Sequence, residues 1–178
     1  MPRADRQQPP DSRELRELVG ALEEQIGDPR SGLPEEVFRF VSRLTPLANV
    51  DLLIEDPRRG TLLTWREDEF FGTGWHLPGG IVRYKETAAQ RVRACAREEL
   101  GVEVAFDETP VAIAEGIAEQ ATRGHHISLL FRCRLLSEPD EGRRAGPRPR
   151  SGDWQWHPRC PGDLLEAQRV FTQYFIDV

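Results

Sequence analysis

The stretch from Gly80 to Val102 contains residue types that suit metal and phosphate chemistry. Glu86 stands just before a segment of helical character, and Glu98 and Glu99 stand at the end of that segment, next to Gly101. Hard carboxylate oxygens on one helix, facing a glycine-rich turn, suit Mg²⁺, because substrate phosphates can complete the shell of this ion. The alternative is a solvated helix end. Glu98 and Glu99 taken alone would favour that alternative, whereas their combination with Gly80 and Glu86 favours a metal site.

A helix must present these carboxylates, and the sequence predicts one over residues 87–100. This segment is rich in alanine, and Gly101 follows it at a position typical of a helix C-terminus. Positions 95 and 99 share one face of such a helix, as do positions 94 and 98.

The rest of the chain predicts a β-rich body with helices on both sides. Residues 46–55 read as a buried strand, and residues 50–66 read as a hairpin around the turn DPRRG. Further strands are expected at 81–84, 102–106, 110–118, 125–136 and 153–157, and further helices at 12–26, after Pro34 and from about 163 to 174. This order predicts an α+β fold, with a mixed β-sheet sandwiched by helices. Residues 1–11 are expected to be disordered, and residues 137–152 to be irregular.

Composition excludes several classes of protein. The 178 residues carry 30 acidic and 24 basic side chains, for a net charge of −6, which argues against a general nucleic-acid binder or a polybasic membrane-surface protein. No apolar run approaches the roughly 20 residues that span a bilayer. The three cysteines fit neither a disulfide framework nor a zinc knuckle, so a cytoplasmic location is expected. All but one of the basic residues are arginines, and guanidinium groups match phosphate oxygens.

The stretch from Gly80 resembles the Nudix box, the signature of a hydrolase family. The matching anchors are Gly80, Glu86, Glu98, Glu99, Gly101 and Val102. Two central positions depart from the box, because Ala94 replaces its arginine and Cys95 replaces its first glutamate. A thiol is a poor ligand for hard Mg²⁺, so fewer or weaker metals are expected than with a full box. The resemblance implies an α/β/α sandwich over residues 33–178, with residues 1–32 as an N-terminal tail and helix.

Within this family the chain looks most like the GDP-mannose mannosyl hydrolase branch, which also lacks that first glutamate. The flanking segments TPLANVDLLIE and GWHLPGG are similar to those of the branch. The resemblance implies Mg²⁺, with Mn²⁺ as an alternative, held chiefly by Glu99 with help from Glu98 and the Gly80 carbonyl. It also implies that Asp51 orients the sugar, that Arg66 contacts the diphosphate, and that the protein is a homodimer.

The branch provides its general base from a late loop with a Gln-His pair, and the equivalent loop EPDEGRRAGPRPRSGD has neither residue. His125 and His157 are the favoured substitutes, because an unperturbed imidazole titrates near neutral pH. Arg83 is a second candidate for binding phosphate, on the expectation that it extends the strand at 81–84. Arg91 and Arg93 are expected at the surface. The arginines of residues 143–150 belong either to a solvated linker or to a loop that closes over a diphosphate.

Three functions remain open at the level of sequence. The leading hypothesis is hydrolysis of a small-molecule nucleotide sugar at the anomeric carbon, which releases a nucleoside diphosphate and a sugar. The second is a pyrophosphohydrolase that attacks phosphorus in a nucleoside diphosphate derivative, which the retained Glu98–Glu99 pair permits. The third is a catalytically weak nucleotide-sugar binding module, which the losses at positions 94 and 95 permit.

Overall fold

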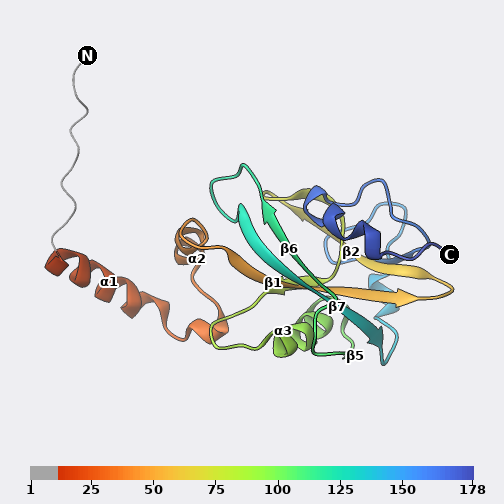
Figure 1. Ribbon diagram of the computed structural model, residues 1–178, viewed down its shortest axis with the longest axis horizontal. Coiled ribbons are helices and arrows are strands. Elements are labelled where there is room, and N and C mark those ends of the chain that lie inside the picture. Colours follow the sequence, from red (N-terminus) through yellow and green to blue (C-terminus); the bar gives the residue numbers. More distant parts are fainter. Residues whose placement is uncertain (1–11) are drawn as a thin grey trace, which may run out of the picture.

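A twisted eight-stranded mixed sheet forms the body of the protein in a computed structural model that describes residues 12–178 (Figure 1). The central path runs β3 (Gly72–His76), β2 (Gly60–Asp68), β1 (Leu47–Asp56), β7 (His125–Leu135) and β5 (Val104–Phe106). Three further strands pair beside this path: β4 (Gly79–Ile81) with β1, β6 (Ala112–Ile117) with β7, and β8 (Trp154–His157) with β2. Among the strand pairs, β1 and β7 are parallel and the rest are antiparallel.

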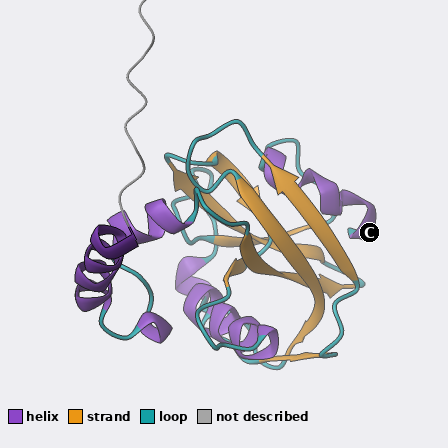
Figure 2. Cartoon of the chain, turned by 60° about the vertical axis from the view of Figure 1, so that its left-hand side comes forward, coloured by secondary structure: helices purple, strands orange, loops and turns teal. Residues whose placement is uncertain are grey.

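Two hydrophobic clusters cover the two faces of the sheet, because β1 buries side chains on both of its faces. Leu52 and Ile54 pack on one side, against helix α3 (Ala88–Cys95). Leu53, between them in sequence, packs on the other side against Phe171 of the 3-10 helix η4 (Glu166–Tyr174). A continuous apolar run is what a strand covered on both faces requires. Figure 2 shows the helices on the two sides of the sheet, which confirms the predicted sandwich.

Helix α3 begins at a capping box, in which the Thr87 hydroxyl accepts from the Gln90 amide N–H and the Gln90 side chain accepts from the Thr87 amide N–H. The predicted helix 87–100 is present, but its last turn, η2 (Ala96–Leu100), is a π-helix. Such turns widen the helix by one residue and are frequent at functional sites. Gly101 closes it with a left-handed conformation (φ 70°), as the sequence predicts.

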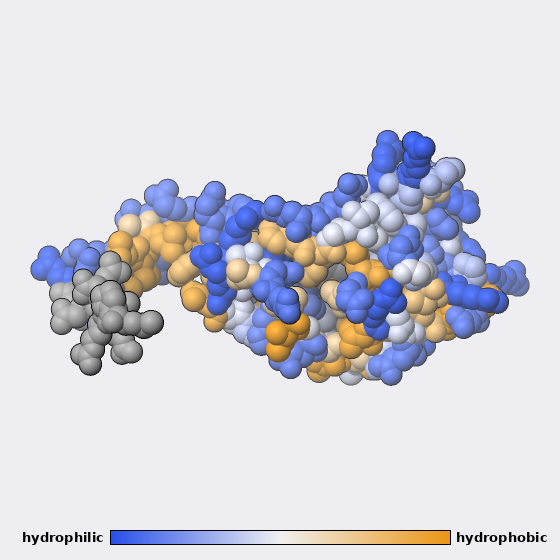
Figure 3. All heavy atoms as spheres, turned by 90° about the horizontal axis from the view of Figure 1, so that it is seen from above, coloured by the Kyte–Doolittle hydropathy of each residue, from blue (hydrophilic) through white to orange (hydrophobic). Residues whose placement is uncertain are grey.

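The N-terminal helix α1 (Ser12–Ile26) is present as predicted, but it buries none of its residues. Leu15, Leu18 and Val19 are exposed on it, and Figure 3 shows apolar side chains gathered on this helix. The short 3-10 turn η1 (Pro29–Ser31) and helix α2 (Glu35–Val41) lead from it to β1. The division of the chain at residue 32 stays a prediction, and residues 1–11 lie outside the described part of the chain.

Two of the predicted elements differ from expectation. The strand predicted at 81–84 lies instead at Gly79–Ile81, and a turn follows at residues 84–85. The C-terminal helix is a 3-10 helix that starts at Glu166 instead of near residue 163. Residues 137–152 form only the short turn η3 (Glu141–Arg143), as predicted, yet this segment is tied down: the Trp154 indole donates to the Asp140 carbonyl, 2.8 Å, and Arg143 donates to the Gly152 carbonyl, 2.6 Å.

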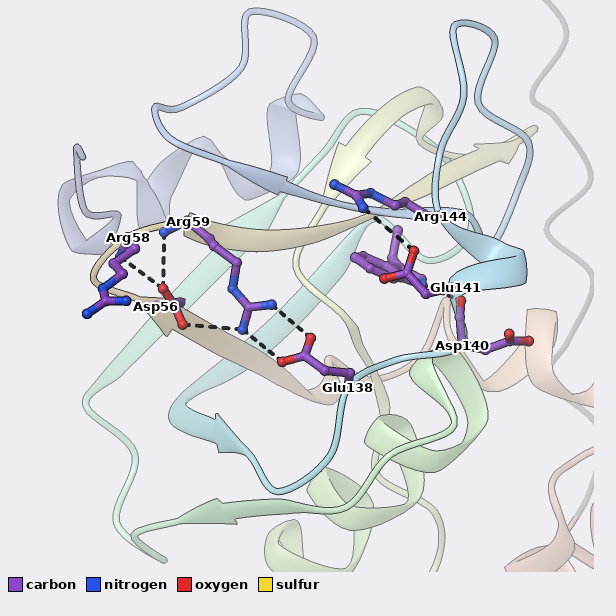
Figure 4. A network of polar contacts seen from close by, with 8 residues as sticks. Asp56, Arg58, Arg59, Glu138, Asp140, Glu141 and Arg144 are labelled. Carbon is purple, nitrogen blue, oxygen red and sulfur yellow. Dashed lines mark hydrogen bonds and ion pairs between the residues drawn. The ribbon is translucent and has the colours of Figure 1, made fainter.

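An ionic network links the β1–β2 hairpin to the segment after β7 (Figure 4). The Arg59 guanidinium donates to both oxygens of Glu138, at 2.8 and 3.2 Å, and to Asp56 at 3.2 Å. The guanidinium carbon of Arg59 lies 4.2 Å from the centre of the Trp156 ring. In the same view Arg144 pairs with Glu141. Arg59 therefore holds the segment to the hairpin, and neither Arg59 nor Arg144 lines the cavity described below.

Candidate functional site

A polar cavity of about 130 Å³ lies where β1, the glycine pair and η4 meet. The residues that line it include the predicted Asp51, Arg66 and Gly80. Its other polar walls are Asn49, His76, Arg123, His126 and Gln168. The structure thus brings together an acid, two arginines and a glycine-rich backbone from four separate parts of the chain.

Asp51 is buried at this cavity and held by two partners. The Ser128 hydroxyl donates to one carboxylate oxygen, and the Gln168 amide donates to the other at 2.9 Å. Burial raises the pKa of Asp51, and these hydrogen bonds oppose the rise. The β1–β4 pairing places Asp51 opposite Gly79, where an added Cβ would collide with the Val50 carbonyl oxygen and lie 3.1 Å from Asp51 Oδ1. Only glycine therefore allows this close approach between the acid and the box entrance.

Glu99 points inward from η2 toward β2 and the glycine pair. One carboxylate oxygen accepts from the Gly79 amide N–H at 2.8 Å, and the other accepts from the Thr64 hydroxyl at 2.9 Å. Thr64 lies 3.1 Å from His76 Nε2, and His76 Nδ1 lies 2.7 Å from the Leu77 carbonyl. Burial raises the pKa of Glu99 to about 7, while burial lowers that of His76 to about 3. A neutral His76 that donates its Nδ1–H to the Leu77 carbonyl has an acceptor at Nε2, so the single hydroxyl proton of Thr64 is shared between His76 and Glu99 and links the two side chains.

Glu98 is partly exposed and meets a buried arginine of the same helix. The Arg91 guanidinium donates to Glu98 at 2.8 Å and lies 3.8 Å from Glu86. Its side chain is only 4% exposed, which contradicts the expected surface position, whereas Arg93 is partly exposed, at 43%. Residues 91 and 98 lie two helical turns apart on one face. Arg91 therefore contacts Glu86 and Glu98, whereas Ala94, at the position of the box arginine, has no charged group to do so.

The donor set fits a weakly held divalent cation. Glu98, Glu99 and the Gly80 carbonyl provide hard oxygens, but no cluster of three metal-binding side chains is found within residues 12–178. The Cys95 thiol lies against Gly80, because a Cβ added at residue 80 would be only 3.1 Å from the Cys95 sulfur. Burial raises the pKa of Cys95 to about 12, so the thiol stays neutral. One or two carboxylates with substrate phosphates satisfy Mg²⁺, so the residues present suit an ion that arrives with its substrate.

The two predicted arginines are placed differently. Arg66 on β2 lines the cavity and lies 3.4 Å from Asp68. Arg83 lies beyond the end of β4, is 40% exposed, and faces Glu98 at 4.0 Å from outside the cavity. The expectation that Arg83 shares the face of an extended strand is wrong, because β4 ends at Ile81 and Arg83 directly precedes the turn at residues 84–85.

Neither histidine favoured as the base faces the cavity. His125 is partly exposed and pairs with Glu115 across β6 and β7, at 3.0 Å. His157 is buried on β8 and packs edge-on against Trp75, with ring centres 4.5 Å apart. His126, the neighbour of His125, lines the cavity instead, because successive residues of a strand face opposite sides. Burial lowers the pKa of His126, and the charge of Asp51 opposes this.

The buried His157 predicts acid sensitivity. Burial lowers its pKa to about 4, and its Nε2 atom is buried without a partner among the described residues. Because the unfolded pKa is near 6.5, the stability from neutral His157 is full above that pH and is lost as pH falls toward 4. Between pH 7 and pH 4 the free energy of unfolding should therefore fall in both proteins, and it should fall by about 1–3 kcal/mol less in His157→Phe than in the wild type. Urea unfolding at both pH values measures this, with His125→Gln as the exposed control. Equal losses in wild type and His157→Phe would contradict it.

Sequence reasoning missed four residues that the structure places at the site. Ser128, Gln168 and Arg123 reach the cavity from distant segments, and no local pattern marks them. Arg91 could have been found, because its seven-residue spacing from Glu98 puts both on one helix face.

Comparisons with known proteins agree with this fold. A family model described as the NUDIX domain matches residues 45–169. The Low-salt glycan biosynthesis protein Agl8 of Haloferax volcanii is 35% identical over 83 residues, which are 47% of this chain and 53% of that protein. The chain therefore spans about half the length of this curated relative.

Solved structures show the same fold at low sequence identity. A possible asymmetric diadenosine tetraphosphate hydrolase from Jonesia denitrificans superposes with a TM-score of 0.56 at 19% identity, over 72% of this chain and 91% of that one. A MutT Nudix hydrolase from Burkholderia pseudomallei gives 0.56 at 22% identity, over 72% and 97%. Since the family model covers more than half of the described sequence, the chain belongs to the Nudix hydrolase family.

Proposed function

We propose that this Nudix hydrolase acts on a nucleotide sugar, in the manner of a GDP-mannose mannosyl hydrolase, and releases a nucleoside diphosphate and a sugar. The observation that carries the proposal is the fixed, buried Asp51 beside Arg66 in one cavity. A carboxylate held by Ser128 and Gln168 can accept a hydrogen bond from a sugar hydroxyl. Arg66 would neutralise charge on the diphosphate. The relative whose name places it in glycan biosynthesis supports a sugar-bearing substrate.

Nudix hydrolases use divalent cations, and in this chain Glu99, Glu98 and the Gly80 carbonyl would hold Mg²⁺ or Mn²⁺. The cation would stabilise negative charge on the diphosphate leaving group. The side chains that would hold the cation are themselves fixed: Arg91 holds Glu98, and Thr64 and the Gly79 amide hold Glu99. Arg66 binds the phosphate oxygens. A hydrogen-bonded site prepared in this way needs little rearrangement during the reaction.

His126 is the proposed general base in place of His125 and His157. It faces the cavity, lies close enough to Asp51 for their charges to interact, and packs against the backbone of Gly116. A neutral imidazole that faces the cavity can take a proton from an attacking water. Assembly as a homodimer remains a prediction from the family resemblance, and a cytoplasmic location remains a prediction from the cysteine pattern.

Hydrolysis of a nucleotide-sugar panel in ¹⁸O-labelled water tests the proposal. We expect the label in the free sugar, because the proposed attack is at the anomeric carbon. Label in a phosphate would instead mean that water attacks phosphorus, and the protein would then be a pyrophosphohydrolase. Tight binding of a nucleotide sugar with no turnover in Mg²⁺ or Mn²⁺ would instead leave a binding module.

A further inference from the structure

Arg123 is a second arginine at the cavity, and the surrounding residues hold its backbone in an unusual conformation. It lies in the turn between β6 and β7 and has a φ of 60°, a value that residues other than glycine seldom adopt. Its amide N–H donates to the Ser42 hydroxyl at 3.1 Å, next to the end of α2 (Figure 1). Its carbonyl accepts from the Gln120 side chain at 3.4 Å. Two contacts thus fix the point from which the side chain extends.

Three phenylalanine rings surround the guanidinium group of Arg123. The guanidinium carbon lies 4.7 Å from the ring centre of Phe70, 5.4 Å from that of Phe38 and 5.6 Å from that of Phe71. Phe38 belongs to α2, and the other two belong to the β2–β3 turn. Aromatic faces attract such a cation and orient its plane without neutralising its charge. Arg123 is therefore ordered before any ligand arrives.

The charge of Arg123 has no close counter-charge in the described part of the chain. Its Nε atom is buried and makes no hydrogen bond there, and Asp68 and Glu35 act on it only as more distant charges. Burial, and after it the positive charge of Arg66, lowers the pKa of Arg123. Two like charges that line one cavity repel each other until an anion lies between them.

An apolar hollow of about 400 Å³ adjoins the polar cavity and shares Phe71, His126 and Ala167 with it. Phe70, Val170 and Phe171 line it further along. A ligand with two adjacent phosphates and an attached planar group would find cations in one compartment and an apolar surface in the other.

We propose that Arg66 and Arg123 form a two-cation site for adjacent phosphates, in which Arg123 binds the second phosphate of a nucleoside diphosphate unit. This inference rests on the proposed function, since it names the part of the substrate that this cavity would select. Planar guanidinium forks match phosphate oxygens, and two of them distinguish a diphosphate from a single phosphate.

Calorimetric titration with inorganic pyrophosphate and inorganic phosphate, at low salt and without metal, tests the two-cation site. We expect the wild type to bind pyrophosphate at least about tenfold more tightly than phosphate, and Arg123→Gln to lose most of that difference. Arg132→Gln is the matched control, because Arg132 is an exposed arginine of β7 that pairs with Glu55. Its titration should equal that of the wild type.

Three results would overturn the inference: Arg123→Gln retains the wild-type preference, Arg132→Gln loses as much as Arg123→Gln, or the wild type shows no preference. If Arg123→Gln does not fold, Arg123→Lys decides. It keeps the charge but loses the planar fork, so we expect an intermediate preference, and a wild-type preference would count against the site. A nucleotide-sugar panel without turnover would refute the proposed function and leave the pyrophosphate result standing, so the two failures can be told apart.

Discussion

Glu99→Gln is expected to lower turnover at least about tenfold, equivalent to about 1.4 kcal/mol of transition-state stabilisation. The amide keeps the shape of the side chain and can still accept from the Gly79 amide N–H, but it removes the negative charge proposed to hold the cation. The measurement is kcat across a Mg²⁺ series, together with the Mg²⁺ concentration at half-maximal rate, which should rise.

Glu103→Gln is the matched control, because Glu103 is an exposed glutamate that pairs with Arg97, near the same helix end. It should retain wild-type turnover. Unchanged Mg²⁺-dependent activity in Glu99→Gln would refute the assignment of Glu99 as the principal ligand. A circular dichroism spectrum equal to that of the wild type separates this result from a loss of fold.

Arg91→Met is expected to lower the free energy of unfolding by about 2–4 kcal/mol, because it leaves Glu86 and part of Glu98 without their buried cation. Methionine fills much of the space of the arginine stem, so the loss reports the charge more than the volume. Turnover should fall as well, since Glu98 loses the partner that orients it. Urea unfolding and kcat measure the two effects.

Arg93→Met is a close control, two residues along the same helix and partly exposed, and it should change stability by less than about 1 kcal/mol. The double change Arg91→Met with Ala94→Arg adds a second test. If the arginine at position 91 substitutes for one at the box position, the double variant should recover part of the lost turnover. Equal effects of Arg91→Met and Arg93→Met would refute a special role for Arg91.

Sequence predicts the fold well where a local pattern determines the structure. The helix ending at Gly101 and the hairpin of β1 and β2 are confirmed, because alanine content, a glycine cap and a turn between apolar runs act over short distances. The strand expected at 81–84 lies instead at Gly79–Ile81, because the backbone hydrogen bonds to β1 extend only as far as Val82. Such pairing depends on a partner strand about 30 residues away and leaves no local signal.

The candidate site divides in the same way. The positions of Asp51, Arg66 and Gly80 follow from their flanking segments, and the structure places all three at one cavity. The choice between His125 and His126 depends on the register of β7, and a one-residue difference in register exchanges the faces of a strand. Arg123 and Gln168 depend on turns whose positions only the complete fold determines.

The pairing of β1 with β7 has a consequence for how the protein folds. Asp51 receives its hydrogen bonds from Ser128 and Gln168, which lie 77 and 117 residues later in the chain. Contacts between residues so far apart form slowly, because a long loop must close before they stabilise anything. We therefore expect the helix after Thr87 and the first hairpin to form early, and the cavity to be assembled among the last parts during refolding. During synthesis on the ribosome, residues 80–102 would therefore emerge well before Ser128 and Gln168, on which the finished cavity depends.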